Sequence, residues 1–101
     1  MKVIYLAMVT LGVVLSVPAK ADEALAKSKN CFACHQVDKK LVGPAYKDVA
    51  AKYKNDPQAP ARLAAKIKAG GKGVWGEVPM PPNAVTDDEA KKLAAWVLSR
   101  K

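Results

Sequence analysis

Histidine and cysteine are scarce in this chain of 101 residues, which has one histidine and two cysteines. All three lie in the stretch NCFACHQ (residues 30–36), as Cys31, Cys34 and His35. A structural zinc site needs four ligands, usually Cys or His, so the chain does not supply a full set. A disulfide between Cys31 and Cys34 would close a very short loop, which adds little stability and leaves His35 unexplained.

Other features are missing too. Aromatic residues make up 6% of the chain and arginines do not cluster, so nothing indicates a nucleic-acid interface. No alternating apolar run is long enough for a pair of strands, and no βαβ pattern surrounds the cysteines. A thioredoxin-like redox pair is therefore disfavoured.

The amino terminus has the order of a secretory signal peptide. Lys2 precedes an uncharged apolar run over 3–17, and the small residues of PAKA follow, which predicts cleavage after Ala21. The rival interpretation is an uncleaved membrane anchor, although the run is short for a span. Cleavage removes Lys2, Lys20 and no acid, so the formal charge falls from +8 to +6. We expect an exported domain of residues 22–101 that is not inserted in a membrane.

The remaining sequence reads as helices separated by long loops. The first helix is predicted over 22–30, because acids precede lysines along it. We expect it to continue into the cysteine motif. A second apolar stripe begins at Tyr46 and is broken by Asp56-Pro57. Further helices are predicted from Pro60 to Gly70, and after a capping box formed by Thr86 and Glu89. The irregular segments 36–44 and 70–85 are long enough to indicate function.

The spacing Cys-x-x-Cys-His favours covalent attachment of haem over a disulfide, a redox pair or zinc. If the motif is helical, a spacing of three puts both cysteines on one side, with His35 beside them to reach the iron. Export agrees with this interpretation, because such cytochromes acquire haem outside the cytoplasm. A domain of this size also needs a staple, and haem would provide one.

The second axial ligand of a haem iron decides what the protein does. With one histidine in the chain, bis-histidine ligation is excluded. Met80 is the one methionine after residue 21, and it stands between Pro79 and Pro81-Pro82, where no helix or sheet continues. His/Met ligation raises the reduction potential and closes both faces of the iron. We therefore predict electron transfer and no enzymatic activity.

Several motifs resemble one family. The Cys-x-x-Cys-His motif, VGPAY (42–46), GVWG (73–76) and VPMPPN (78–83) are similar to small class I bacterial cytochromes c of the c-551/c-552 type. The resemblance implies an all-α fold of about four helices around one haem c, ligated by His35 and Met80. It also implies a monomeric periplasmic shuttle whose acceptor is a nitrite reductase, a terminal oxidase or a peroxidase.

The resemblance assigns supporting roles to four further residues. The Pro44 carbonyl would accept the Nδ1–H of His35, and the Trp75 indole would donate to a haem propionate. Lys66 stands where the family often has an arginine for the same propionate, and lysine lacks the bidentate fork. Asn83 would approach the methionine sulfur. Trp96, on a helical stripe, is expected in the core.

Two alternative functions stay open: a haem enzyme or small-gas sensor from which Met80 dissociates, and a haem subunit held permanently in a larger complex. For a carrier, we expect redox partners to dock on an apolar rim surrounded by lysines. The expected rim residues are Phe32, Ala33, Leu41, Val42, Val78, Pro79 and Pro81, and the expected lysines are Lys29, Lys39, Lys40 and Lys72.

Overall fold

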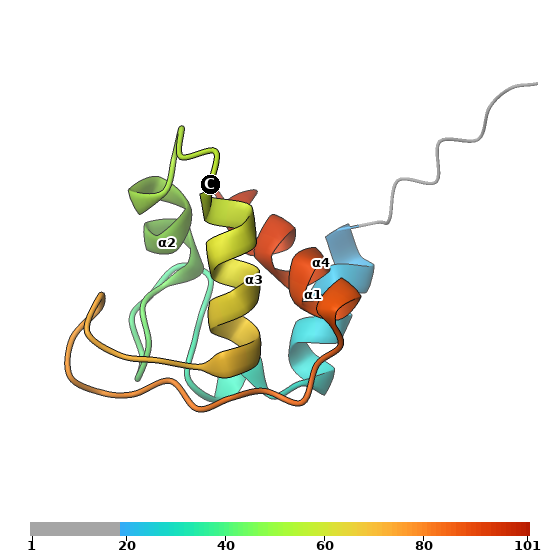
Figure 1. Cartoon of the computed structure of the whole chain (residues 1–101), viewed down its shortest axis with the longest axis horizontal. Coiled ribbons are helices and arrows are strands. Elements are labelled where there is room, and N and C mark those ends of the chain that lie inside the picture. Colours follow the sequence, from blue (N-terminus) through green and yellow to red (C-terminus); the bar gives the residue numbers. More distant parts are fainter. Residues whose placement is uncertain (1–18) are drawn as a thin grey trace, which may run out of the picture.

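The computed structural model describes residues 19–101, so most of the expected signal peptide lies outside the described residues. In this part of the chain, four α-helices and one 3₁₀ turn are joined by loops, with two isolated bridges and no strand (Figure 1). The elements are α1 (Ala19–Ser28), η1 (Cys31–Ala33), α2 (Tyr46–Lys52), α3 (Ala59–Ala69) and α4 (Asp87–Leu98). The all-helical prediction is confirmed.

Helix α4 is the centre of the fold and packs against α1, α2 and α3. Its start is fixed by the predicted capping box, because Thr86 Oγ accepts the Glu89 N–H and Glu89 accepts the Thr86 N–H. Its buried face includes Leu93 and Trp96, and Trp96 is only 3% exposed. Trp96 is therefore a core residue, as the sequence predicts.

The cysteine motif is not a continuation of α1, which corrects one prediction. Helix α1 ends at Ser28, and Asn30 then adopts a left-handed conformation with φ of 61°. Asparagine tolerates this conformation better than most residues, so the chain can change direction there. Cys31 begins a separate short 3₁₀ turn, which Cys34 ends.

Helices α2 and α3 both contact α4, and they differ in how deeply their apolar residues are buried. Helix α2 buries Tyr46 and Val49, and it ends at Lys52, before the predicted break at Asp56-Pro57. Helix α3 has Pro60 in its first turn and ends at Ala69, and Gly70 follows it with a φ of 74°. The α3 residues Leu63, Ala64 and Ile67 are only half-buried, so part of their apolar surface is not covered by the other helices.

Two loops complete the structure. The first, residues 34–45, leads from the cysteine turn to α2, and the second, residues 70–86, leads from α3 to α4 and extends away from the helices (Figure 1). Among residues 19–101, no helix has the length and apolar character needed to cross a membrane.

Candidate cofactor site

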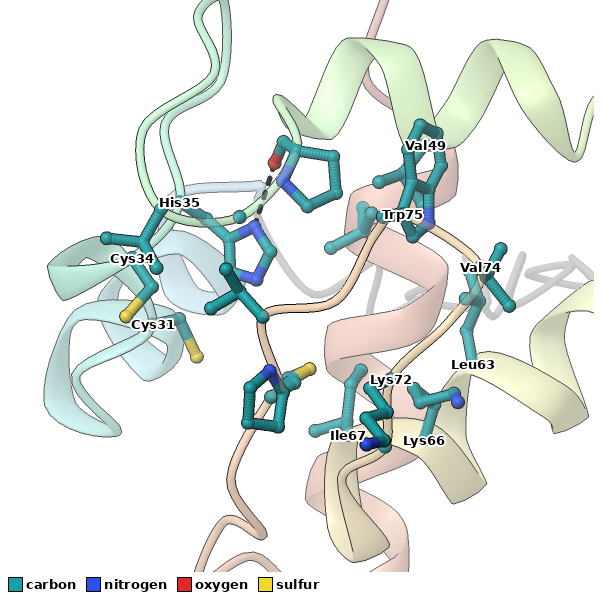
Figure 2. Close-up of a pocket in the computed structure, with 18 of the residues that line it drawn as sticks. Cys31, Cys34, His35, Val49, Leu63, Lys66, Ile67, Lys72, Val74 and Trp75 are labelled. Carbon is teal, nitrogen blue, oxygen red and sulfur yellow. Dashed lines mark hydrogen bonds between the residues drawn. The ribbon is translucent and has the colours of Figure 1, made fainter.

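A cavity of about 290 Å³ lies between the two loops and the helices α2, α3 and α4. Figure 2 shows Cys31, Cys34 and His35 on one side and Lys66, Ile67 and Leu63 of α3 on the other. Seven of the eight predicted site residues line it, and Asn83 lies outside. The seven are Cys31, Cys34, His35, Pro44, Lys66, Trp75 and Met80.

The cysteine turn brings two free thiols next to the histidine. The Cys31 carbonyl accepts the N–H groups of Cys34 at 3.3 Å and His35 at 3.0 Å, so one tight turn carries all three side chains. Figure 2 shows both sulfur atoms beside the His35 ring. Burial raises the pKa of the Cys31 thiol, so the neutral thiol is favoured before any covalent attachment.

The His35 ring is held by three neighbours from the segment 43–46. Its Nδ1 lies 2.8 Å from the Pro44 carbonyl oxygen, which makes Nδ1 the protonated nitrogen and leaves the Nε2 lone pair free. A Cβ atom on Gly43 would overlap three atoms of the ring, so only glycine permits this approach. The Tyr46 ring stacks on the imidazole at a centroid distance of 5.0 Å.

The Met80 backbone is fastened to the end of α3. Gly71 N–H donates to the Met80 carbonyl at 3.0 Å, and Met80 N–H donates to the Gly71 carbonyl at 2.8 Å. Gly70 lies so close to the backbone of Met80 and Pro81 that a Cβ atom there would collide with it. Met80 is thus fixed by the bridge as well as by its flanking prolines.

Asn83 ties the same loop to α3. Its side-chain N–H donates to the Ile67 carbonyl at 2.8 Å, and its backbone N–H donates to the Lys68 carbonyl at 3.3 Å. These bonds tie the loop that carries Met80 to the end of α3, and Asn83 itself does not line the cavity. A contact with the Met80 sulfur stays a prediction.

The loop of residues 70–86, here called the methionine loop, also places Trp75 at the edge of the cavity. Trp75 is 42% exposed, and the Lys52 ammonium lies 5.5 Å from the centroid of its ring. Lys66 packs against Gly71, where a Cβ atom would collide with the ammonium. Lys40, Lys66 and Lys72 line the cavity with one acid, Glu77, so its charge favours an anionic occupant.

Sequence reasoning missed three residues of this site. Gly43 and Tyr46 belong to the VGPAY motif, but the sequence assigned no role to Gly43 and placed Tyr46 only on an apolar helical stripe. Lys52 had no motif at all, because its contact with Trp75 joins residues 23 positions apart. The available signal was the VGPAY motif (42–46), which contains Gly43, Pro44 and Tyr46.

The expected docking surface needs two corrections. Phe32 points into the fold, where its ring makes edge contacts with Tyr46 at 6.0 Å and Trp96 at 6.1 Å. Lys29 is engaged within the chain, donating to the Ala84 carbonyl at 3.1 Å and lying 3.6 Å from the Glu89 carboxylate. Neither side chain is therefore a free part of the rim.

Comparison with known proteins places the chain in a family. The sequence profile of the cytochrome c family matches residues 20–101. The chain belongs to this family. It is 56% identical over 98 residues to cytochrome c-551 of Pseudomonas aeruginosa, covering 95% of this chain and 94% of that one. It is 62% identical over 81 residues to cytochrome c-552 of Hydrogenobacter thermophilus, covering 80% and 83% respectively.

The fold agrees with solved cytochromes c as well. The crystal structure of wild-type Nitrosomonas europaea cytochrome c552 matches with a TM-score of 0.76 at 57% identity. The match covers 78% of this chain and 99% of that chain. The chain is accordingly a small class I cytochrome c, and its function is electron transport.

The cavity fits the prosthetic group of this family. Haem c needs two thiols for its thioether bonds, and Cys31 and Cys34 present them on one turn. It needs apolar walls for the macrocycle, and the half-buried Leu63 and Ile67 supply part of them. It carries two carboxylates, which suit the excess of lysines. This cytochrome c binds haem c covalently through Cys31 and Cys34.

Proposed function

We propose that this chain is a soluble, exported one-electron carrier in which His35 and Met80 are the axial ligands of the haem iron. When bound, haem c supplies an iron that exchanges one electron without any change in the protein's covalent bonds. The observation that carries the proposal is the meeting of His35 and Met80 in one cavity, each held by backbone hydrogen bonds. A carrier benefits from ligands that hardly move between oxidation states.

The two ligands have different properties, and the chain sets both. His35 offers Nε2 because Pro44 occupies Nδ1, and this hydrogen bond makes the imidazole a stronger donor. Met80 offers a thioether, which favours the reduced iron and raises the potential. The bridge between Gly71 and Met80 holds the backbone that carries the thioether.

Three further residues are proposed to adjust the site. Trp75 and Lys66 line the cavity and are proposed to donate to the haem carboxylates. Lysine is a point donor, so Lys66 would contribute charge without the geometry of an arginine fork. Asn83 is proposed to tune the potential by fixing the methionine loop, with a direct approach to the sulfur as the finer form of this role.

An enzyme or gas sensor would need Met80 to leave the iron. The bridge to Gly71 and the hydrogen bonds from Asn83 to the end of α3 oppose such movement. Withdrawal of the whole loop would break several of these bonds together, which supports the carrier.

The partner surface is proposed to surround the mouth of the cavity. We define the mouth surface by its exposed apolar residues Leu41, Val42, Val74, Trp75 and Val78. Val78 is 64% exposed, and the exposed lysines Lys39, Lys40 and Lys72 lie in the same two loops. An apolar centre with a positive border suits brief docking of an acidic redox protein, such as a nitrite reductase, a terminal oxidase or a peroxidase. Pro79 and Pro81 border Met80 and complete the rim.

Location in the periplasm and action as a monomer are part of the same proposal. The A-x-A site before Asp22 predicts removal of residues 1–21 on export. The intact mass of the exported protein should equal residues 22–101 plus one haem. The bare polypeptide mass would contradict both the covalent haem and the function.

The ligand assignment is tested by Met80→Ala. The thioether bonds from Cys31 and Cys34 do not depend on Met80, so haem should remain attached. Loss of the sulfur leaves an axial position to water and should lower the reduction potential. Redox titration of the variant beside the wild type measures the shift, and identical potentials would show that Met80 is not a ligand.

A further inference from the structure

The Tyr46 ring connects the histidine to the centre of the fold. On one partner it stacks against the His35 imidazole, with an interplanar angle of 21° and a centroid distance of 5.0 Å. On the other it makes an edge contact with the α4 residue Trp96, at 76° and 5.3 Å. Since Tyr46 is only 5% exposed, its ring has little room to move.

Tyr46 and Trp96 are each held in place by their own neighbours. The Tyr46 backbone N–H donates to the Gln36 carbonyl at 2.9 Å, which ties the start of α2 to the residue after the histidine. The buried Trp96 Nε1 has no hydrogen-bond partner among the described residues, so its side-chain nitrogen contributes no anchor. The indole is held by its edge contacts with Tyr46 and Phe32 and by the Arg100 guanidinium, which lies 4.7 Å from the ring centroid.

The existing restraints on His35 leave its plane incompletely defined. The hydrogen bond to Pro44 fixes the position of Nδ1, but such bonds tolerate a range of angles. Gly43 limits how far the ring can move towards the backbone. A flat aromatic contact restricts the tilt of the imidazole, which neither of those contacts does alone.

We infer that Tyr46 is a positioning residue that sets the plane of the His35 imidazole and transmits the packing of α4 to it. This inference rests on the proposed function, in which His35 binds the iron through Nε2. Removing the flat ring should broaden or rotate the orientation of the imidazole. Removing only the hydroxyl group should not.

The test compares three variants of the holoprotein by NMR in the oxidised state. The iron-induced shifts of haem methyl protons depend on the plane of the axial imidazole. Tyr46→Leu should change the pattern of these shifts, whereas Tyr46→Phe should keep the wild-type pattern. Val85→Ala is the control for lost core packing, since Val85 is buried in the core and does not line the cavity. It should keep the pattern even if it lowers stability.

Three results would overturn the inference. They are an unchanged pattern in Tyr46→Leu, the same change in Val85→Ala, or a full change in Tyr46→Phe. If Tyr46→Leu does not fold, the reduced wild-type protein answers instead. Nuclear Overhauser effects between the rings of Tyr46 and His35 support the inference, and their absence refutes it. Failure of the proposed function looks different, because His35 ring protons would then lack large iron-induced shifts in the oxidised wild type.

Discussion

Gly71 and Met80 exchange two backbone hydrogen bonds, which join the end of α3 to the methionine loop. The intervening segment 72–79 carries Trp75 and most of the mouth surface. One bridge therefore positions the proposed iron ligand and the proposed docking residues together. This coupling suits an electron carrier, because it keeps the distance between the proposed ligand and the docking surface constant.

Gly43→Ala should disturb His35 through a direct collision. The backbone of Gly43 does not need a positive φ, so the methyl group causes no backbone strain and acts only through its overlap with the ring. We expect a loss of stability of about 1–3 kcal/mol, as for other overpacked positions. The variant should also show a shifted reduction potential. Thermal unfolding and redox titration of the holoprotein measure the two effects.

Gly73→Ala is the matched control for this prediction. Gly73 has a φ of 103° and open space around its Cβ position, so alanine there strains the backbone without touching His35. It should lower stability and leave the potential close to wild type. Equal shifts of potential in the two variants would show that the Gly43 contact with His35 has no special role.

Docking on the mouth surface should depend on salt and on the position of each lysine. The Debye length falls from about 30 Å at 0.01 M to about 10 Å at 0.1 M, so steering by lysines weakens over this range. Lys40→Glu should slow electron exchange with an acidic redox protein more than Lys91→Glu, a change on α4. Stopped-flow rates at several ionic strengths measure the difference. Equal slowing by both variants at low salt would place the docking surface elsewhere.

The cap of α4 should make stability depend on pH. The Thr86 backbone N–H, with a smaller contribution from nearby Lys29, lowers the pKa of the Glu89 carboxyl below its ordinary value. A carboxyl with a lowered folded-state pKa stabilises the fold above its unfolded pKa. That contribution disappears as the pH falls through the folded pKa. Glu89→Gln should therefore be less stable than wild type at neutral pH, with the difference vanishing in acid.

Thr86→Ala separates the two halves of the cap. The Thr86 hydroxyl does not titrate and is only a minor cause of the lowered pKa of Glu89, so most of its loss, about 1 kcal/mol, should persist in acid. Urea unfolding of the holoprotein between neutral and acidic pH compares both variants with the wild type. A constant deficit for Glu89→Gln would contradict a role for its ionisation.

The sequence predicted the parts of this molecule that short-range patterns determine. The capping box at Thr86, the proline at the start of α3 and the glycine at its end each act within a few residues, and all were found. The continuity of α1 with the cysteine turn was predicted wrongly. That boundary depends on the left-handed Asn30, which no periodicity reveals.

The site itself was only partly predictable. Residue type and spacing are enough to predict haem attachment at the cysteine motif and iron ligation by the proline-flanked Met80. Three other contacts depend on how the helices and loops meet in space. They are the stack of Tyr46 on His35, the contact of Lys52 with Trp75 and the ion pair of Lys29 with Glu89. Such contacts have no local sequence signal, so the sequence did not reveal them.

Carbon monoxide binding by the reduced holoprotein at neutral pH tests the central claim most directly. If Met80 and His35 hold both axial positions in a fastened loop, the absorption spectrum of the wild type should not change when carbon monoxide is added. Met80→Ala should bind it readily, which shows that the assay detects an open iron. Tight binding by the wild type would contradict the account and would favour a sensor or an enzyme.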